Sequence, residues 1–380
     1  MIIAVNLLGV NKEIGGAYNY IDNLLTGLNN QNKLHIIKIF YADSNRELVV
    51  KHKNLELIFC KVNSFNRLSR IIYENTFFQY LLYKHKVDLV LWPCDTMGFI
   101  KTRPSIVISH DFLPLINPKS YSFFKKFYLK FALRFAIRNA DYYFFISRTT
   151  QKELKQISPN FDIKKSEIIP NIIDNAFKKL NSDELKYINL DFELPSKYFL
   201  YVAHYYPHKN HKKLIKSYAK YRDDSNLRGC DYLKLVLRGD GLQDNDEISQ
   251  IIVDYNLFND VIFIPRVSQS ELIKVYNLAS ALVFPSFYEG GGIPVMEAFA
   301  CGCFIIASEI EAVIEFTGGN FLRFDTNSEE SITKSLQEFT INNSILNSLS
   351  EESQLIIENH REFSVIKRFF AGISFLQERL

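Results

Sequence analysis

The sequence has no apolar run long enough to span a bilayer, and it has few cysteines. A membrane-spanning helix needs about 20 consecutive apolar residues, and no run reaches that length. The five cysteines are odd in number, scattered and without metal-ligand spacing, which is typical of free thiols in a reducing compartment. They are Cys60, Cys94, Cys230, Cys301 and Cys303. These features exclude a disulfide-stapled secreted domain and an integral membrane protein.

The amino terminus, MIIAVNLLGVNKE, lacks the basic start and cleavage site of a signal peptide. We therefore expect a cytoplasmic protein, either free or peripheral on the inner face of the plasma membrane. Residues 1–170 hold 24 Lys or Arg and 13 Asp or Glu, whereas residues 171–380 hold 21 and 29. The basic first half indicates an anionic partner. Because no nucleic-acid-binding motif accompanies the charge, nucleic acid is not expected, and contact with an anionic membrane surface is left open.

The alternation of strand-like and helix-like segments predicts an α/β protein of two Rossmann-like domains facing a central cleft. A chain of 380 residues suits two domains, and the polar stretch 170–195 is the expected hinge between them. Ligands of such sheets bind at the carboxyl ends of strands. We expect strands at 2–8, 34–41, 55–60, 88–92, 105–109 and 142–146, then at 198–203, 234–237, 261–264, 281–284, 303–307 and 321–324.

The segment from Phe284 to Ala307, FPSFYEGGGIPVMEAFACGCFIIA, places two glutamates around a glycine-rich turn between a strand and a helix. Glycine backbone N–H groups at a helix start suit phosphate, and the carboxylates of Glu289 and Glu297 accept hydrogen bonds from hydroxyls. Nucleotide sugars carry both kinds of group. The alternative is a tight turn that caps an ordinary core helix.

This segment closely resembles the signature of the retaining glycosyltransferases of family 4, in which two glutamates separated by seven residues stand in a PSxxEGxGxPxxEAxAxG frame. The resemblance covers essentially the whole chain and is strongest from 198 to 307. It implies the GT-B fold, with an acceptor-binding domain at 1–172 and a nucleotide-sugar-binding domain at 173–361. It also implies that the carboxyl-terminal helix, 362–380, packs back on the first domain.

The same resemblance assigns roles to residues around the donor sugar. Glu289 would bind sugar hydroxyls near the transferred carbon, and Glu297 would hold the ribose. Gly291, Gly292 and Ile293 would add backbone N–H contacts. His110, which follows the strand IVIS, would approach the reaction centre and is, with Glu289, the catalytic candidate; a structural histidine is the alternative.

A second group of residues would surround the donor phosphates and base. Gly15-Gly16 precedes a helix and matches the glycine loop of the family, although a plain loop is the alternative. Lys209 matches the family lysine that binds the diphosphate; the alternative is that it belongs to a solvated basic helix start. His204 stands where many relatives carry arginine, so phosphate binding would be weaker or more dependent on pH. By resemblance, Arg266 and Val267 border the base.

Asp244-Asn245-Asp246 looks like the metal-binding DxD motif of the other major glycosyltransferase fold. It precedes a helix, where such residues are also common caps, and we favour capping. We therefore predict no cofactor and no obligatory metal ion.

Two helical segments have aromatic stripes. In residues 121–140 the stripe lies beside four cations; we favour the core for the aromatic residues and leave membrane attraction of the cations open. The amphipathic segment 362–380 is expected to dock through one apolar side. The first stripe comprises Phe124, Phe127, Tyr128, Phe131 and Phe135, with Lys125, Lys126, Lys130 and Arg134 beside it; the second comprises Phe363, Ile366, Phe370 and Ile373.

The predicted function is a retaining, metal-independent transfer of a hexose from a GDP- or UDP-sugar, with GDP-mannose as the first choice. The acceptor would be a glycan or a lipid-linked saccharide of a bacterial surface polysaccharide such as O-antigen or capsule. The resemblance implies retention by front-face attack, and double displacement through a carboxylate is the rival mechanism. The alternative function is a non-catalytic nucleotide-sugar-binding scaffold subunit, against which the presence of Glu289, Glu297, Lys209 and His110 argues.

Overall fold

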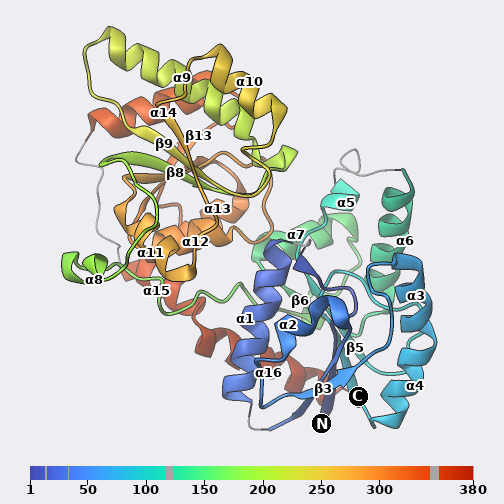
Figure 1. The fold of residues 1–380 in the computed structure, drawn as a ribbon. Helices are drawn as coiled ribbons and strands as arrows, with labels where there is room; N and C mark the ends of the chain where they lie inside the picture. The colour runs from blue at the N-terminus through green and yellow to red at the C-terminus, as the bar shows by residue number, and fades with distance from the viewer. Residues whose placement is uncertain (13–14, 33, 117–122, 343–350, 380) are drawn as a thin grey trace. The chain divides into compact units, whose positions relative to one another are not determined.

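The computed structural model describes residues 1–12, 15–32, 34–116, 123–342 and 351–379. The chain forms two compact units, the first of Met1–Ile172 with His360–Leu380 and the second of Ile173–Asn359. Each unit is built on a parallel sheet with helices packed against it (Figure 1). The expected α/β class with two Rossmann-like units is confirmed.

In its described part, the first unit contains a seven-stranded sheet in the order β3-β2-β1-β4-β5-β6-β7. All neighbouring strands are parallel. The strands are β1 (Ile2–Asn6), β2 (Ile36–Tyr41), β3 (Glu56–Phe59), β4 (Leu89–Trp92), β5 (Ser105–Ser109), β6 (Tyr142–Phe145) and β7 (Ser166–Ile168). The helices are α1 (Gly16–Gln31), α2 (Arg46–Val49), α3 (Arg67–Asn75), α4 (Phe77–Lys84), α5 (Leu113–Ile116), α6 (Phe123–Asn139), α7 (Arg148–Ile157) and α16 (Glu362–Gln377).

The second unit contains, in its described part, a six-stranded parallel sheet in the order β10-β9-β8-β11-β12-β13. Its strands are β8 (Tyr198–Val202), β9 (Lys234–Arg238), β10 (Val261–Ile264), β11 (Ala281–Phe284), β12 (Phe304–Ser308) and β13 (Leu322–Phe324). Its helices are α8 (Ser182–Lys186), α9 (His211–Leu227), α10 (Asp246–Asp254), α11 (Gln269–Leu278), α12 (Ile293–Ala300), α13 (Glu311–Thr317), α14 (Glu329–Ile341) and α15 (Glu351–Asn359).

All twelve predicted strands are present, each with ends within two residues of the expected ones. The sequence reading missed β7, which is three residues long and pairs only with β6 at the sheet edge. None of the five cysteines, all within the described ranges, forms a disulfide, as expected. Among the described helices, none is both long and apolar enough to cross a membrane.

Helix α16, although last in the chain, packs against α1 of the first unit. Gly27 of α1 leaves room for Ile366, since a Cβ there would lie 2.7 Å from the isoleucine side chain. Ile366 and Ile373 are buried as expected, but Phe363 is 70% exposed, so its predicted docking is wrong. The buried face instead runs through residues such as Phe369, whose ring contacts Phe144 of β6.

The prediction that the aromatic stripe of α6 belongs to the core is wrong for two of its members. Phe127 is 73% and Phe131 57% exposed, whereas Tyr128 and Phe135 are half-buried. The physical reason is that the opposite, smaller face of the helix packs inward, through Ala132, Leu133 and Ala136. The side chain of Phe124 lies outside the described residues.

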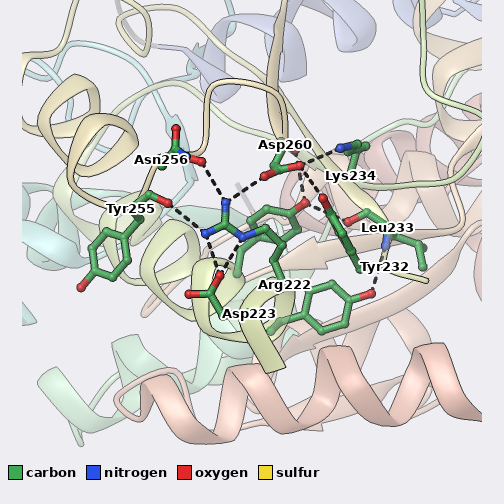
Figure 2. Close-up of polar contacts among 10 residues, drawn as sticks. Arg222, Asp223, Tyr232, Leu233, Lys234, Tyr255, Asn256 and Asp260 are labelled. Atoms are coloured by element: carbon green, nitrogen blue, oxygen red, sulfur yellow. Dashed lines mark hydrogen bonds and ion pairs between the residues drawn. The ribbon is translucent and has the colours of Figure 1, made fainter. Parts of the chain in front are cut away.

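A buried ionic cluster fastens α9 of the second unit to the neighbouring turn and strand (Figure 2). Arg222 donates to the backbone carbonyls of Tyr255 and Asn256 and to the carboxylate of Asp260, the last at 2.9 Å. Lys234 and Tyr232 donate to the other oxygen of the same carboxylate. Burial opposes ionisation of Asp260, but these hydrogen bonds prevail and lower its pKa below the usual value.

Replacing Asp260 by asparagine should lower the free energy of unfolding of the second unit by about 2 kcal/mol, because Arg222 and Lys234 lose their shared buried partner. In thermal unfolding this corresponds to a shift of about 6 °C. Asp223→Asn is the matched control: Asp223 contacts the same guanidinium but is 54% exposed, so its loss should cost no more than about 0.5 kcal/mol. Equal effects of the two substitutions would contradict this account.

Candidate functional site

The order of the strands reverses at one place in each sheet, between β1 and β4 in the first unit and between β8 and β11 in the second. Ligands of parallel α/β sheets bind beyond the carboxyl ends of the strands at such a switch point. Lys209 follows β8 and Glu289 follows β11, so the two residues come from opposite sides of the second switch point. The second unit therefore carries its candidate residues where the topology places a ligand.

Lys209 and Glu289 form an ion pair, with 2.5 Å between Nζ and Oε1. Their side chains are only 17% and 9% exposed, so the pair is largely shielded from water. The ammonium group also lies 5.8 Å from the centre of the Phe284 ring. Shielded charges interact more strongly than surface charges, and a charged ligand that enters here would exchange partners with them.

The backbone around Lys209 is held by two side chains. Asn210 adopts the left-handed conformation, with φ of 59°, which asparagine tolerates better than most residues. Its buried amide donates to the carbonyls of Pro285 and Thr326, and Tyr201 donates its hydroxyl to the carbonyl of Lys209 at 2.7 Å. The sequence reading missed Asn210, because its role depends on residues far away in the chain.

The glycine turn after β11 leads directly into α12. Gly292 has φ of 44°, and a Cβ at this position would lie 2.8 Å from the ring of Phe316, so only glycine fits. Gly291 and Gly292 thus precede Ile293, the first residue of α12. Pro294 has no N–H, and the N–H groups of Val295 and Met296 donate to the carbonyl of Gly292, so the donors of this helix start beside Glu289 are those of the glycine turn and Ile293.

Glu297 lies on α12, and its carboxylate accepts a hydrogen bond from the hydroxyl of Tyr276 at 2.9 Å. Burial raises the pKa of Glu297 to about 7, against the opposing effects of this hydrogen bond and of the Arg238 charge. Tyr276 is itself fully buried on α11. Tyr276 could not be predicted as a partner of Glu297 from the sequence, because a buried aromatic residue on a helix is typical of a hydrophobic core.

His204 follows β8 and is held by the neighbouring loop, where the backbone N–H of Asp240 donates to its Nδ1 at 3.0 Å. Burial lowers the pKa of His204 and outweighs the opposing effect of the Asp240 charge, while the positive charge of Arg238 acts in the same direction as burial. The imidazole is therefore neutral at pH 7. Gly239 allows this close packing, because a Cβ there would lie 1.8 Å from the carbonyl oxygen of Ala203.

Arg238 is the last residue of β9. Its Nε is buried, and within the described part of the chain it has no hydrogen-bond partner. Its charge acts on both His204 and Glu297. Arg266 and Val267 follow the adjacent strand β10, the first exposed and the second half-buried. Arg238 thus offers the positive charge that His204 lacks.

In the first unit, His110 follows β5 and is 7% exposed. Its Nε2 donates to the carbonyl of Pro93 at 2.7 Å, and its ring meets that of Tyr20 edge-on. Asp95 accepts a hydrogen bond from the backbone N–H of His110 at 2.6 Å, and burial raises the pKa of this carboxyl group to about 6. Asp111 accepts from the N–H of Leu113 and so orients the loop.

Two further predicted motifs can be located in the structure, the glycine pair and the cap of α10. Gly15, with φ of 58°, precedes α1, which begins at Gly16, so the glycine pair lies beyond the end of β1 as predicted. The side chain of Asn245 accepts a hydrogen bond from the N–H of Ile248, which confirms that this motif caps α10. Within the described ranges, no group of three or more His, Cys, Asp or Glu residues is placed to hold a metal ion.

Comparisons with known proteins relate both units to glycosyltransferases. The family model described as "Glycosyltransferase Family 4" matches residues 14–177, and the model described as "Glycosyl transferases group 1" matches residues 188–362. Serotype-specific mannosyltransferase WbdA of Escherichia coli is 24% identical over 276 residues, which make up 70% of this chain and 32% of WbdA. O-antigen chain mannosyltransferase RfbU of Salmonella typhimurium is 28% identical over 230 residues, or 60% of this chain and 59% of RfbU.

Among solved structures, sucrose-phosphate synthase from Thermosynechococcus elongatus superposes with a TM-score of 0.79 at 16% identity, and the match covers 100% of both chains. This chain spans about a third of WbdA and about three-fifths of RfbU. The two family models together account for most of the sequence, and the fold agrees with them. The chain therefore belongs to family 4 of the glycosyltransferases and has the GT-B fold.

Proposed function

We propose that the protein transfers a hexose from a nucleotide-diphosphate sugar to a glycan or lipid-linked acceptor during synthesis of a bacterial surface polysaccharide. The observation that carries the proposal is the shielded Lys209–Glu289 pair at the switch point of the second sheet. The relatives WbdA and RfbU are named as mannosyltransferases. GDP-mannose is therefore the first donor to test, and UDP-sugars are the next.

In this proposal the donor diphosphate displaces Glu289 as the partner of Lys209. The glycine turn and the start of α12 supply N–H donors to the phosphates, and Arg238 supplies a second positive charge. Glu289, released from the lysine, then accepts hydrogen bonds from hydroxyls of the sugar. Since two cations and a helix amino terminus balance the diphosphate, the reaction as proposed requires no metal ion and no cofactor.

The transfer is proposed to retain the anomeric configuration by front-face attack. The acceptor oxygen forms a bond to the anomeric carbon while the bond from that carbon to the diphosphate breaks. The departing phosphate oxygen takes the proton of the acceptor hydroxyl. The protein then contributes electrostatic stabilisation of the leaving group rather than a nucleophile.

The first unit is proposed to bind the acceptor beyond the carboxyl ends of β1, β4 and β5. His110, neutral and fixed through Pro93, would contact the reacting groups as a hydrogen-bonding partner rather than as a cation. A lipid-linked acceptor would bring the protein to the membrane surface. Peripheral association with an anionic membrane is therefore part of the proposal.

Donor use is expected to depend on pH through Glu297. Its pKa of about 7 means that the carboxyl group is mostly protonated below neutrality, and it then loses its negative charge and part of its capacity to accept hydrogen bonds from the ribose. We expect kcat/KM for the donor to rise with pH, with its midpoint at about pH 7, and to level off about one pH unit higher, because kcat/KM reports ionisations of the free enzyme. Measured pH profiles should flatten in Glu297→Gln.

Tyr276→Phe provides a second check of this dependence. The substitution removes the hydrogen bond that favours the ionised form of Glu297, so the midpoint of the pH profile should move upward while the ring still fills its place. A midpoint unchanged in Tyr276→Phe, or a profile unchanged in Glu297→Gln, would remove Glu297 from the donor site.

The test of the proposed function is a panel of GDP- and UDP-sugars, offered with and without EDTA, in the presence of glycan and lipid-linked acceptors. Turnover of one donor that survives EDTA is the expected result. Binding of a donor without turnover under any of these conditions would favour the non-catalytic scaffold function instead. The anomeric configuration of the product, read by NMR, decides between retention and inversion.

A further inference from the structure

One face of the first unit combines exposed apolar side chains from neighbouring helices. We define the α3–α6 face as residues 67–84 and 123–139, which form α3, α4 and α6 (Figure 1). On α6, Phe127 and Phe131 are 73% and 57% exposed; on α3, Leu68 and Ile72 are 67% and 55% exposed. Soluble proteins rarely gather large apolar side chains in this way unless a partner covers them.

An open cavity of about 470 Å³ lies between α3 and α6. Its lining is almost entirely apolar and is shared by the two helices and the loop that carries Phe99. The ring centres of Phe99 and Phe131 lie 5.4 Å apart. The cavity is therefore suited to hydrocarbon rather than to a sugar. Its lining residues are Ile71, Phe99, Phe123, Phe127, Tyr128 and Phe131.

The charge of this face has a single sign. Its two segments contain eight Lys or Arg residues and one acidic residue, Glu74. The Glu74 side chain is only 12% exposed and lies 3.9 Å from Arg70, so it adds no negative charge to the surface. A second copy of the chain could not pair symmetrically through this face without bringing like charges together. An anionic surface with an apolar interior matches both properties.

We propose that the α3–α6 face docks on an anionic lipid bilayer, with Phe127 and Phe131 inserted at the level of the headgroups and the neighbouring cations among the lipid phosphates. Exposed aromatic rings flanked by Lys and Arg are the features that hold a helix at the membrane interface. The biological role of this docking rests on the proposed function, because a lipid-linked acceptor would lie in that bilayer. Its test does not depend on that function.

The face also connects to the strand ends of the first unit. The guanidinium carbon of Arg67 lies 5.5 Å from the ring centre of Tyr128, and Glu74 accepts a hydrogen bond from Asn6 at the end of β1. Polar side chains thus run from the apolar cavity to the carboxyl edge of the sheet. A docked acceptor would have its hydrocarbon at the α3–α6 face and its saccharide near β1.

The test is sedimentation of the full chain with vesicles of phosphatidylcholine alone and of phosphatidylcholine mixed with phosphatidylglycerol. We expect binding to the mixed vesicles only. The double variant Phe127→Ser, Phe131→Ser should lower the partition coefficient at least roughly tenfold. Lys126→Gln and Lys130→Gln should each lower it about fivefold, and added salt should weaken the wild type.

Phe258→Ser is the matched control, because Phe258 is 63% exposed but belongs to the second unit. It should bind vesicles as the wild type does, and thermal unfolding should show that both phenylalanine variants are folded. Absence of binding to anionic vesicles, or equal binding of the double variant, would overturn the proposal. Light scattering that reveals a dimer dissociated by the double variant would assign the face to a second copy instead.

The vesicle assay contains no donor, so it stands even if the protein proves not to transfer sugar. Conversely, transfer to a water-soluble acceptor should be unchanged in Phe127→Ser, Phe131→Ser, because neither residue belongs to the proposed donor site. A loss of that transfer would contradict the assignment of this face to the bilayer. The two proposals therefore fail in separate experiments.

Discussion

Replacing Glu289 by glutamine is expected to lower sugar transfer by roughly two to three orders of magnitude while leaving donor binding intact. The carboxylate is the group that the proposal places against the transferred sugar, where charge develops in the transition state. Its loss should also release Lys209 from the 2.5 Å ion pair, so the donor phosphates no longer compete with a carboxylate for the lysine. We therefore expect kcat to fall while KM for the donor stays level or decreases.

Steady-state measurements of kcat and KM on the purified variant check this prediction. Glu309→Gln is a suitable control, since Glu309 is 60% exposed and pairs with Arg323 rather than with a site residue. It should leave both constants unchanged. A Glu289→Gln variant with normal kcat and raised KM would show that Glu289 contributes only to binding, contrary to the proposed role.

The second large effect is expected for Lys209→Ala, which should raise KM for the donor about 100-fold. A charge-assisted hydrogen bond to phosphate contributes up to about 3 kcal/mol, and roughly 2.7 kcal/mol corresponds to two orders of magnitude in affinity. Because the same substitution leaves Glu289 shielded and without its cation, donor repulsion should add to the loss. Titration of the inert nucleoside diphosphate by calorimetry measures the change directly.

Lys213→Ala is the control for general positive charge. Lys213 lies on α9, shortly after Lys209 in the chain, and its ammonium group donates to the carbonyl of Asn327 rather than to Glu289. This variant should bind nucleotide within about twofold of the wild type. Equal losses in Lys209→Ala and Lys213→Ala would mean that the basic start of α9 attracts the donor without a specific contact.

Much of the fold follows from local features of the sequence. A continuous apolar run such as Leu89–Trp92 is typical of a strand that is buried on both faces of a parallel sheet, and this run is β4 in the structure. The short edge strand Ser166–Ile168 has no comparable run, so its pairing with β6 was not predictable. The aromatic stripe of α6 shows a different limit, because periodicity identifies a face of a helix but not whether it meets protein.

The site could be predicted only in part for a related reason. Glu289, Glu297 and the glycines stand in one continuous motif, which made them recognisable. Tyr276 and Arg238 act on Glu297 from other elements, and only the folded sheet brings them together. Sequence spacing carries no information about such contacts between distant residues. That phosphate binding is weaker or more dependent on pH because His204 replaces an arginine stays a prediction.

The measurement that tests the account most directly follows labelled sugar from the nucleotide donor into an acceptor in the presence of EDTA, with the wild type, Lys209→Ala and Glu289→Gln assayed side by side. The account predicts transfer by the wild type, a defect of Lys209→Ala that high donor concentration relieves, and a defect of Glu289→Gln that it does not. Transfer retained in both variants, or absent from the wild type with every donor and acceptor, would contradict the claim that this pair forms the donor site of a working glycosyltransferase.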